Sequence, residues 1–218
     1  MITLYAFGSC PDFARGLTRD LRVRWALEEA GLPYETVLID YAASRSSAHL
    51  ELNPFGQVPA VQAAGLPTFE SGAIVLHIAE KSETLLPSDP GARAAAISWM
   101  FAALNSIEPM LLGLLDADIF HAREPWAKEM RAAMEARATK RLALLEAHLE
   151  NREYVTGQFT AADLLMTTVL RMLRHTELLG RFPHVSALKE RCQARPAFQK
   201  ALADQLSSLD RTIGEQAR

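Results

Sequence analysis

The stretch that decides the fold is NPFGQVPAVQAAGLPTFES, residues 53–71. Two turn-forming dipeptides, NP and FG, open it, and a strand-like run with a proline follows them. Because proline cannot donate a ladder hydrogen bond, Pro59 is expected at the first residue or the edge of a strand. A cis bond at Pro59 would turn the backbone of Val58 outward, where its N–H and C=O could pair with an extended peptide. Local chemistry alone favours trans, because only about 5–6% of X–Pro bonds in folded proteins are cis.

The same stretch ends in an acid and a hydroxyl, Glu70 and Ser71, at an expected strand-to-helix junction. Ser71 is expected to cap the helix that follows, leaving free N–H groups and the positive helix end as a site for a ligand carboxylate. Glu70 can pair with a ligand ammonium. Together the two positions suit the headgroup of an α-amino acid, although Ser71 could equally serve the helix alone.

The first eighty residues alternate strand and helix patterns, which predicts an α/β layer. The expected strands are Ile2–Ala6, Glu35–Ile39, Pro59–Gln62 and Thr68–Phe69. The expected helices are Arg22–Ala30, Ser44–Leu52 and Ser71–Glu80, with Gly31 and Pro33 ending the first of them. The predicted order is therefore βαβαββα.

The second half of the chain is predicted to be helical. A proline-rich linker, residues 82–91, separates an α/β domain of residues 1–81 from an all-α domain of residues 92–218. Hydrophobic periodicity predicts the helices Ala92–Ala122, bent or broken at Pro109, Trp126–Asn151, Ala161–Leu179, Val185–Ala194 and Pro196–Leu206. The polar tail Asp210–Arg218 is expected to fray.

Composition excludes several classes of protein. The chain has 218 residues, a net charge of −3 and scattered basic residues, which argues against nucleic-acid and membrane-surface partners. Two distant cysteines, Cys10 and Cys192, favour a reducing compartment over a disulfide framework. No basic leader and no apolar run long enough to cross a membrane is apparent, so the expected location is the cytoplasm. No His/Cys cluster has metal-ligand spacing, so no metal is expected.

Four segments in chain order carry a family resemblance. NPFGQVPAV, followed after about ten residues by FESGAIVLHIAEK, closely resembles the cytosolic glutathione transferases of the bacterial type. The segments RVRWALEEAGLPYE and FTAADLLM extend the resemblance over essentially the whole chain. The resemblance implies a thioredoxin-like N-terminal domain and an all-helical C-terminal domain. It also identifies Thr160–Asp163 as a helix-capping box, in agreement with the local chemistry of a Thr followed by an acid three residues later.

What the resemblance implies about function is specific. Glutathione would be bound by Gln57, by the backbone of Val58 beside cis Pro59, and by Glu70 and Ser71, which would hold its γ-glutamyl headgroup. The enzyme would be a homodimer that adds the glutathione thiolate to a small apolar electrophile, with a role in detoxification. The electrophile site is expected between the domains, and helical spacing alone would place most of its candidates in the core. These candidates are Trp99, Met100, Ala103, Leu104, Ile107, Met110 and Leu111.

The residue that activates the thiol is the open question in the sequence. A free thiol has a pKa near 8.5, so the protein must lower it, and a hydroxyl donor near a helix N-terminus can do so. The loop between Phe7 and Arg22 is about eight residues longer than the family pattern. Counting back from the following helix places Thr18 at the family's catalytic hydroxyl, whereas counting forward from the strand places Ser9 and Cys10 there.

Thr18 and Cys10 can each also be explained by a structural role unrelated to activation of the thiol. Thr18 could be only an N-cap, and a lone cysteine is often a small buried hydrophobe. Cys10 as nucleophile would make the protein a glutathione-dependent thiol reductase. Two further alternatives are a non-catalytic glutathione or ligand binder and an isomerase that uses glutathione.

Overall fold

The computed structural model describes residues 1–216, with side chains described through residue 209. The chain forms two compact units. The first contains Met1–Leu86 together with the chain from Arg195 onward, and the second is Pro87–Ala194. The last helix, which the sequence places in the all-α domain of residues 92–218, packs on the first helix of the first unit.

A four-stranded mixed sheet forms the centre of the first unit. Its strands are β1 (Ile2–Phe7), β2 (Tyr34–Ile39), β3 (Ala60–Ala63) and β4 (Leu66–Phe69). They lie in the order β2-β1-β3-β4, with β1 parallel to β2 and the other pairs antiparallel. Leu4 and Ala6 are fully buried while their neighbours in β1 are partly exposed, as the two-residue strand period requires. The predicted thioredoxin-like fold is confirmed.

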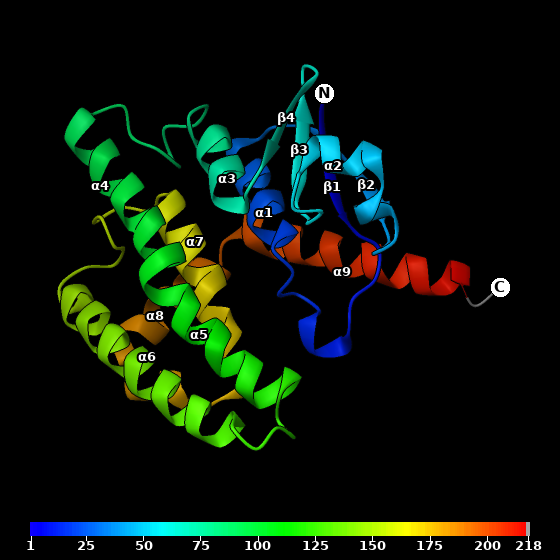
Figure 1. The fold of residues 1–218 in the computed structure, drawn as a ribbon. Coiled ribbons are helices and arrows are strands. Elements are labelled where there is room, and N and C mark those ends of the chain that lie inside the picture. Colours follow the sequence, from blue (N-terminus) through cyan, green and yellow to red (C-terminus); the bar gives the residue numbers. More distant parts are fainter. Residues whose placement is uncertain (217–218) are drawn as a thin grey trace. The chain divides into compact units, whose positions relative to one another are not determined.

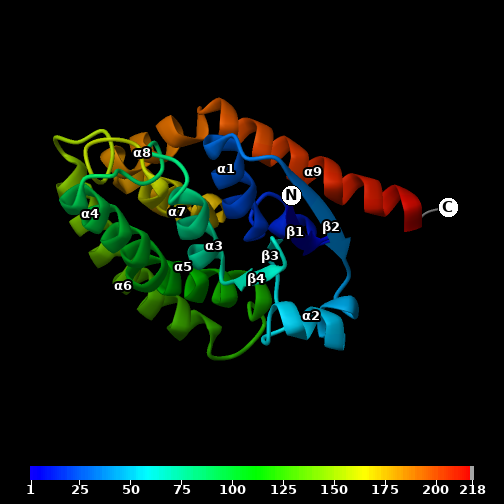
Figure 2. The ribbon, with the colours of Figure 1, turned by 90° about the horizontal axis from the view of Figure 1, so that it is seen from above.

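Three helices cover this sheet. Helices α1 (Asp20–Ala30) and α3 (Ser71–Ala79) lie on one face, and the short α2 (Ser47–Leu52) lies on the other (Figure 2). Two 3₁₀ turns, η1 (Asp12–Ala14) and η2 (Ala43–Arg45), precede α1 and α2. Gly31 ends α1 with φ of +64°, a left-handed conformation that favours glycine, as the sequence predicts.

The last helix, α9 (Pro196–Gln216), runs alongside α1 (Figures 1 and 2). The fully buried rings of Trp25 and Phe198 meet edge to face with centroids 4.9 Å apart. The guanidinium of Arg195 also donates to both carboxylate oxygens of Glu29, at 2.6 and 2.8 Å. The helix extends beyond its predicted end at Leu206 and through most of the tail expected to fray; residues 217–218 lie outside the described part of the chain.

The second unit is all-helical, which confirms the predicted class. Its helices are α4 (Pro90–Phe101), α5 (Glu108–Leu115), α6 (Ala127–Leu149), α7 (Ala161–Leu170) and α8 (Pro183–Gln193). Two π-helical segments, η3 (Ala102–Ile107) and η4 (Asp116–Phe120), and two 3₁₀ segments, η5 (Arg171–His175) and η6 (Leu178–Arg181), continue or follow them. The predicted helix Ala161–Leu179 is therefore shorter, since it tightens to 3₁₀ geometry after Leu170.

Of the bend or break predicted at Pro109, the break does not occur. The chain stays helical from Pro90 to Phe120, and the π-helical turn η3 ends at Ile107, two residues before the proline. A π-helical turn changes the hydrogen-bond pattern locally, so the missing N–H and the ring of Pro109 are accommodated without ending the helix.

The same run bears on the expectation that no segment is apolar enough to cross a membrane. By length and composition alone, Pro90–Phe120 meets the criteria for such a span, so that expectation was wrong as a statement about the sequence. Core helices of water-soluble proteins meet the same criteria, and one such run is weak support for a membrane segment.

The capping box at the start of α7 is confirmed. The Thr160 hydroxyl accepts from the Ala162 N–H at 3.3 Å, and one Asp163 oxygen accepts from the Thr160 N–H at 2.9 Å. The other Asp163 oxygen accepts from the Val155 N–H at 2.8 Å. Burial raises the pKa of Asp163 to about 6, and these hydrogen bonds oppose the shift.

Candidate functional site

The loop that leads into β3 leaves the backbone of Val58 available. The Val58–Pro59 peptide bond is cis, and β3 begins only at Ala60. Within the described residues, the N–H and C=O of Val58 have no hydrogen-bond partner. Val58 therefore offers one donor and one acceptor, the pair that an extended peptide needs to bind strand-fashion.

Two buried side chains fix the peptide unit before Val58. Nδ2 of Asn53 donates to the Gln57 carbonyl at 2.9 Å, and Nε2 of His49 lies 3.0 Å from the same oxygen. Both side chains are nearly fully buried. Gly56 has φ of +62°, and a Cβ there would meet the Ser44 carbonyl at 2.9 Å, so the loop requires glycine at this position. Gln57 itself is exposed, and its side chain is accessible to a ligand.

Ser71 occupies a different position from the one predicted. It is the first residue of α3, and Glu70 takes the cap position without a side-chain cap bond. The Ser71 hydroxyl oxygen accepts a hydrogen bond from Nη1 of Arg22 at 3.1 Å, and both side chains are buried. Because the oxygen already accepts from a cation, the hydroxyl hydrogen is directed elsewhere and can be donated to a ligand carboxylate.

Glu70 is exposed and has φ of +66°, a conformation that non-glycine residues rarely adopt. Such backbone strain is typical of functional sites, where the surrounding structure holds it in place. The arrangement presents a carboxylate directly before the N-terminus of α3, so a ligand ammonium and a ligand carboxylate can be bound at adjacent positions.

Thr18 lies two residues before α1 and is half-buried. The alternative explanation, in which Thr18 is the N-cap of this helix, is wrong, because Arg19 takes that position and makes no side-chain cap bond. The Thr18 carbonyl accepts from the Leu21 N–H at 3.0 Å and from Nε2 of Gln205 at 3.3 Å. The hydroxyl is therefore not used as a helix cap, and it lies near the positive end of α1.

Cys10 follows β1 and is partly exposed. The 3₁₀ turn η1, not a longer helix, comes after it, and α1 begins ten residues later. Neither Cys10 nor Cys192 forms a disulfide within the described residues. The η1 turn therefore separates Cys10 from α1 along the chain.

The candidates for the electrophile site divide by burial. Met100, Ala103, Ile107 and Leu111 are buried in the core of the second unit, as helical spacing alone predicts. Trp99, Leu104 and Met110 are partly exposed and remain candidates. No group of three or more His, Cys, Asp or Glu residues able to hold a metal ion occurs in the described part of the chain.

Both units match models of known domains. Residues 13–80 match the N-terminal domain of glutathione S-transferases, and residues 117–205 match the C-terminal domain. Glutathione S-transferase 1 of Zea mays is 34% identical over 203 residues, which cover 84% of this chain and 90% of the relative. The chain belongs to the glutathione S-transferase family. The predicted family is thereby confirmed.

Solved structures of this family superpose on the transferase over most of its length. A glutathione transferase from Burkholderia graminis, solved with two glutathione molecules per subunit, is 31% identical with a TM-score of 0.81, over 92% of this chain and 87% of that one. A family member from Pseudomonas fluorescens, also with two glutathione molecules bound, is 29% identical with a TM-score of 0.81, over 92% of both chains.

Three residues that support the candidate glutathione site were not predicted from the sequence. Arg22, His49 and Asn53 act through buried hydrogen bonds to residues on other segments. A charged or polar residue within an apolar helical stripe is the one signal that could have pointed to Arg22, because it lies among buried neighbours in α1.

Proposed function

We propose that this protein is a glutathione transferase that binds glutathione on the first unit and adds its thiolate to a small apolar electrophile. The cysteinyl part of the peptide pairs with the backbone of Val58, beside Pro59 and Gln57. The γ-glutamyl headgroup pairs its ammonium with Glu70 and its carboxylate with Ser71 and the N-terminus of α3. The observation that carries the proposal is the unpaired backbone of Val58 within the described residues, on a loop held by two buried side chains.

Thr18 donates its hydroxyl hydrogen to the glutathione sulfur and lowers the thiol pKa. Its position before α1 supports this role, because a hydroxyl donor and a helix N-terminus both stabilise a thiolate. Cys10 is the competing candidate, and its chemistry would be thiol reduction rather than conjugation. The protein acts in the cytoplasm as a homodimer, in keeping with the family resemblance.

A titration of bound glutathione tests the assignment. Thiolate absorbance is followed against pH for the wild-type protein and for Thr18→Ala, Thr18→Ser and Cys10→Ser. The wild-type protein should hold the bound thiol pKa below the free value near 8.5. Thr18→Ala should raise that pKa by roughly one to two units, the worth of a hydrogen bond to a charged group.

Thr18→Ser keeps the hydroxyl and should keep most of the effect, and Cys10→Ser should leave conjugation intact. If Thr18→Ala is harmless while Cys10→Ser abolishes glutathione chemistry, the thiol-reductase function replaces this one. Retention of glutathione without any lowering of the thiol pKa in the wild-type protein would indicate a non-catalytic binder.

A further inference from the structure

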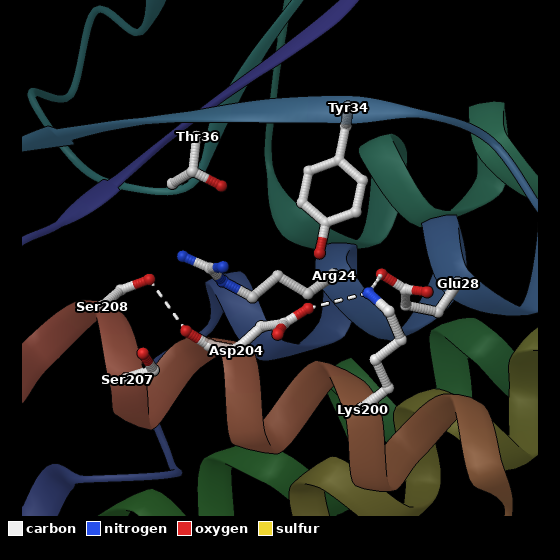
Figure 3. Close-up of a pocket in the computed structure, with 8 residues that line it drawn as sticks. All are labelled: Arg24, Glu28, Tyr34, Thr36, Lys200, Asp204, Ser207 and Ser208. Carbon is white, nitrogen blue, oxygen red and sulfur yellow. Dashed lines mark hydrogen bonds and ion pairs between the residues drawn. The ribbon is translucent and has the colours of Figure 1, made fainter.

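A second polar pocket lies within the first unit, away from the Val58 loop. It has a volume of about 510 Å³ and is formed by α1, β2 and α9 (Figure 3). This volume is within the range of small-molecule sites. None of its lining residues belongs to the glutathione site proposed above.

Hydrogen-bond donors gather at one end of this pocket. The side chain of Arg24 is 3% exposed, and its Nε donates to the buried carboxylate of Asp20 at 2.8 Å. Its two terminal nitrogens have no partner among the described residues, and Figure 3 shows the guanidinium ending in the pocket beneath Thr36. The Thr36 hydroxyl is likewise without a partner in the described part of the chain. A guanidinium fork with an adjacent hydroxyl suits a carboxylate.

Hydrogen-bond acceptors gather at the other end. Nζ of Lys200 donates to one oxygen of Glu28 at 2.6 Å and to one oxygen of Asp204 at 2.9 Å. Among the side chains described, those of residues 1–209, the second oxygen of each carboxylate has no partner. The Tyr34 phenol points between the two ends (Figure 3). Burial raises its pKa, and Arg24, Glu28, Asp204 and Lys200 all act on it, so these charges are close together.

The charges of the side chains at this pocket indicate which charged groups a ligand should carry. Arg24 is already neutralised by a buried carboxylate, whereas Lys200 faces two carboxylates, so the side chains described at this pocket carry one excess negative charge. A simple anion would be repelled by the acceptor end, and a simple cation would leave the guanidinium fork unused. We propose that this pocket binds the zwitterionic headgroup of an α-amino acid. The ligand carboxylate is bound by Arg24 and Thr36, and the ammonium by Glu28 and Asp204.

A chemical-shift titration of the ¹⁵N-labelled protein with glycine tests this site. Glycine should move the backbone amides of Arg24 and Thr36. Acetate and methylamine, each carrying half of the zwitterion, should bind at least about tenfold more weakly, because each loses one set of charge-assisted hydrogen bonds. Acetate binding as tightly as glycine, or no shift with glycine, would overturn the proposal.

Two variants separate binding from folding. Thr36→Val removes a hydroxyl donor and Asp204→Asn removes a negative charge, each at a partly exposed position, and each should weaken glycine binding about fivefold to tenfold. Thr3→Val on the neighbouring strand β1 is the matched control, since Thr3 bonds Glu35 outside the pocket and should leave binding unchanged. Equal effects of Thr36→Val and Thr3→Val would count against the site.

The headgroup could come from a free amino acid or from glutathione itself. The titration is therefore repeated with glutathione on the Ser71→Ala variant, in which the proposed glutathione site is weakened. Shifts at Thr36 with both ligands indicate a shared headgroup site, and shifts with glycine alone indicate a free amino acid. Thr36→Val should leave glutathione conjugation unchanged, so failure of this site is distinguishable from failure of the proposed transferase function.

Discussion

Ser71 and Arg22 form a buried hydrogen-bonded pair, and the proposed binding of the glutathione headgroup depends on it. The buried guanidinium of Arg22 occupies the acceptor side of the Ser71 hydroxyl, and this leaves its hydrogen for a carboxylate. The N-terminal N–H groups of α3 lie at the same place. In the proposed complex, the Ser71 hydroxyl and the dipole of α3 hold the headgroup carboxylate, and Glu70, directly before α3, holds its ammonium.

Replacement of Ser71 by alanine measures the hydroxyl donor. Ser71→Ala removes one hydrogen bond to a charged group and should raise the glutathione Kd about tenfold, equivalent to about 1.4 kcal/mol. Isothermal titration calorimetry gives the Kd directly. Ser98→Ala is the matched control, because the exposed Ser98 hydroxyl bonds, among the described residues, only the Ala94 carbonyl of its own helix. An unchanged Kd for Ser71→Ala would remove Ser71 from the binding site.

Residues of the proposed site could be identified from the sequence where their role is local. Val58, Pro59, Glu70 and Ser71 stand in short motifs whose turn and helix-start chemistry can be interpreted directly. Arg22 was missed because its partner is 49 residues away, and only the packing of α1 against α3 brings them together. The Ser71 cap was predicted wrongly because Glu70 takes the cap position through its left-handed backbone.

At the scale of elements, α9 stabilises the start of α1. Nε2 of the buried Gln205 donates to a carboxylate oxygen of Asp20 at 2.8 Å and to the Thr18 carbonyl at 3.3 Å. The last helix therefore supports the turn that carries the proposed thiol-activating hydroxyl. Sequence periodicity predicts that α9 exists, but it cannot predict which unit the helix packs against.

Gln205→Leu should lower the free energy of unfolding by about 2–3 kcal/mol, because the buried Asp20 loses a donor. Urea unfolding followed by circular dichroism measures the change. Ser207→Leu, on the exposed side of the same helix, is the matched control and should stay within about 0.5 kcal/mol of the wild-type protein. Equal stability of the two variants would contradict this role of Gln205.

The capping box of α7 predicts a second stability effect. Asp163 accepts three hydrogen bonds at a buried helix start, so Asp163→Ala should cost about 2–3 kcal/mol. Asp89→Ala removes an exposed cap of α4 that accepts one bond and should cost about 1 kcal/mol. Urea unfolding of the two variants at one pH compares the costs; a larger loss for Asp89→Ala would contradict the role assigned to Asp163.

The pH dependence of the Asp163 contribution has a definite sign. Burial raises its pKa from 3.8 to about 6, so between these values the folded state binds more protons than the unfolded state. Its contribution to stability is full below about pH 4 and is lost as the pH rises through about 6. The free energy of unfolding of the wild-type protein should therefore contain a decrease as the pH rises from about 4 to about 6, and Asp163→Ala should remove that decrease. An identical pH profile in the variant would contradict the shifted pKa.

At the scale of the whole molecule, one aromatic residue is suited to subunit association. Phe55 is 61% exposed, and its ring is held by edge-to-face packing on Phe69, with centroids 6.2 Å apart. Exposed aromatic anchors of this kind dominate many protein interfaces. Phe55→Ser should shift the proposed homodimer towards monomer in sedimentation velocity, whereas Leu144→Ser, at a 65% exposed position on α6, should not. A wild-type monomer would refute the dimer.

The central claim is that glutathione binds on the Val58 loop and at the start of α3. Chemical-shift titration of the ¹⁵N-labelled protein with glutathione tests it most directly, because the backbone amides of Val58 and Ser71 are themselves the proposed contacts. If glutathione binds there, these two amides should show large chemical-shift changes that saturate with one common Kd. Saturating shifts elsewhere, with the Val58 and Ser71 amides unmoved, would contradict it.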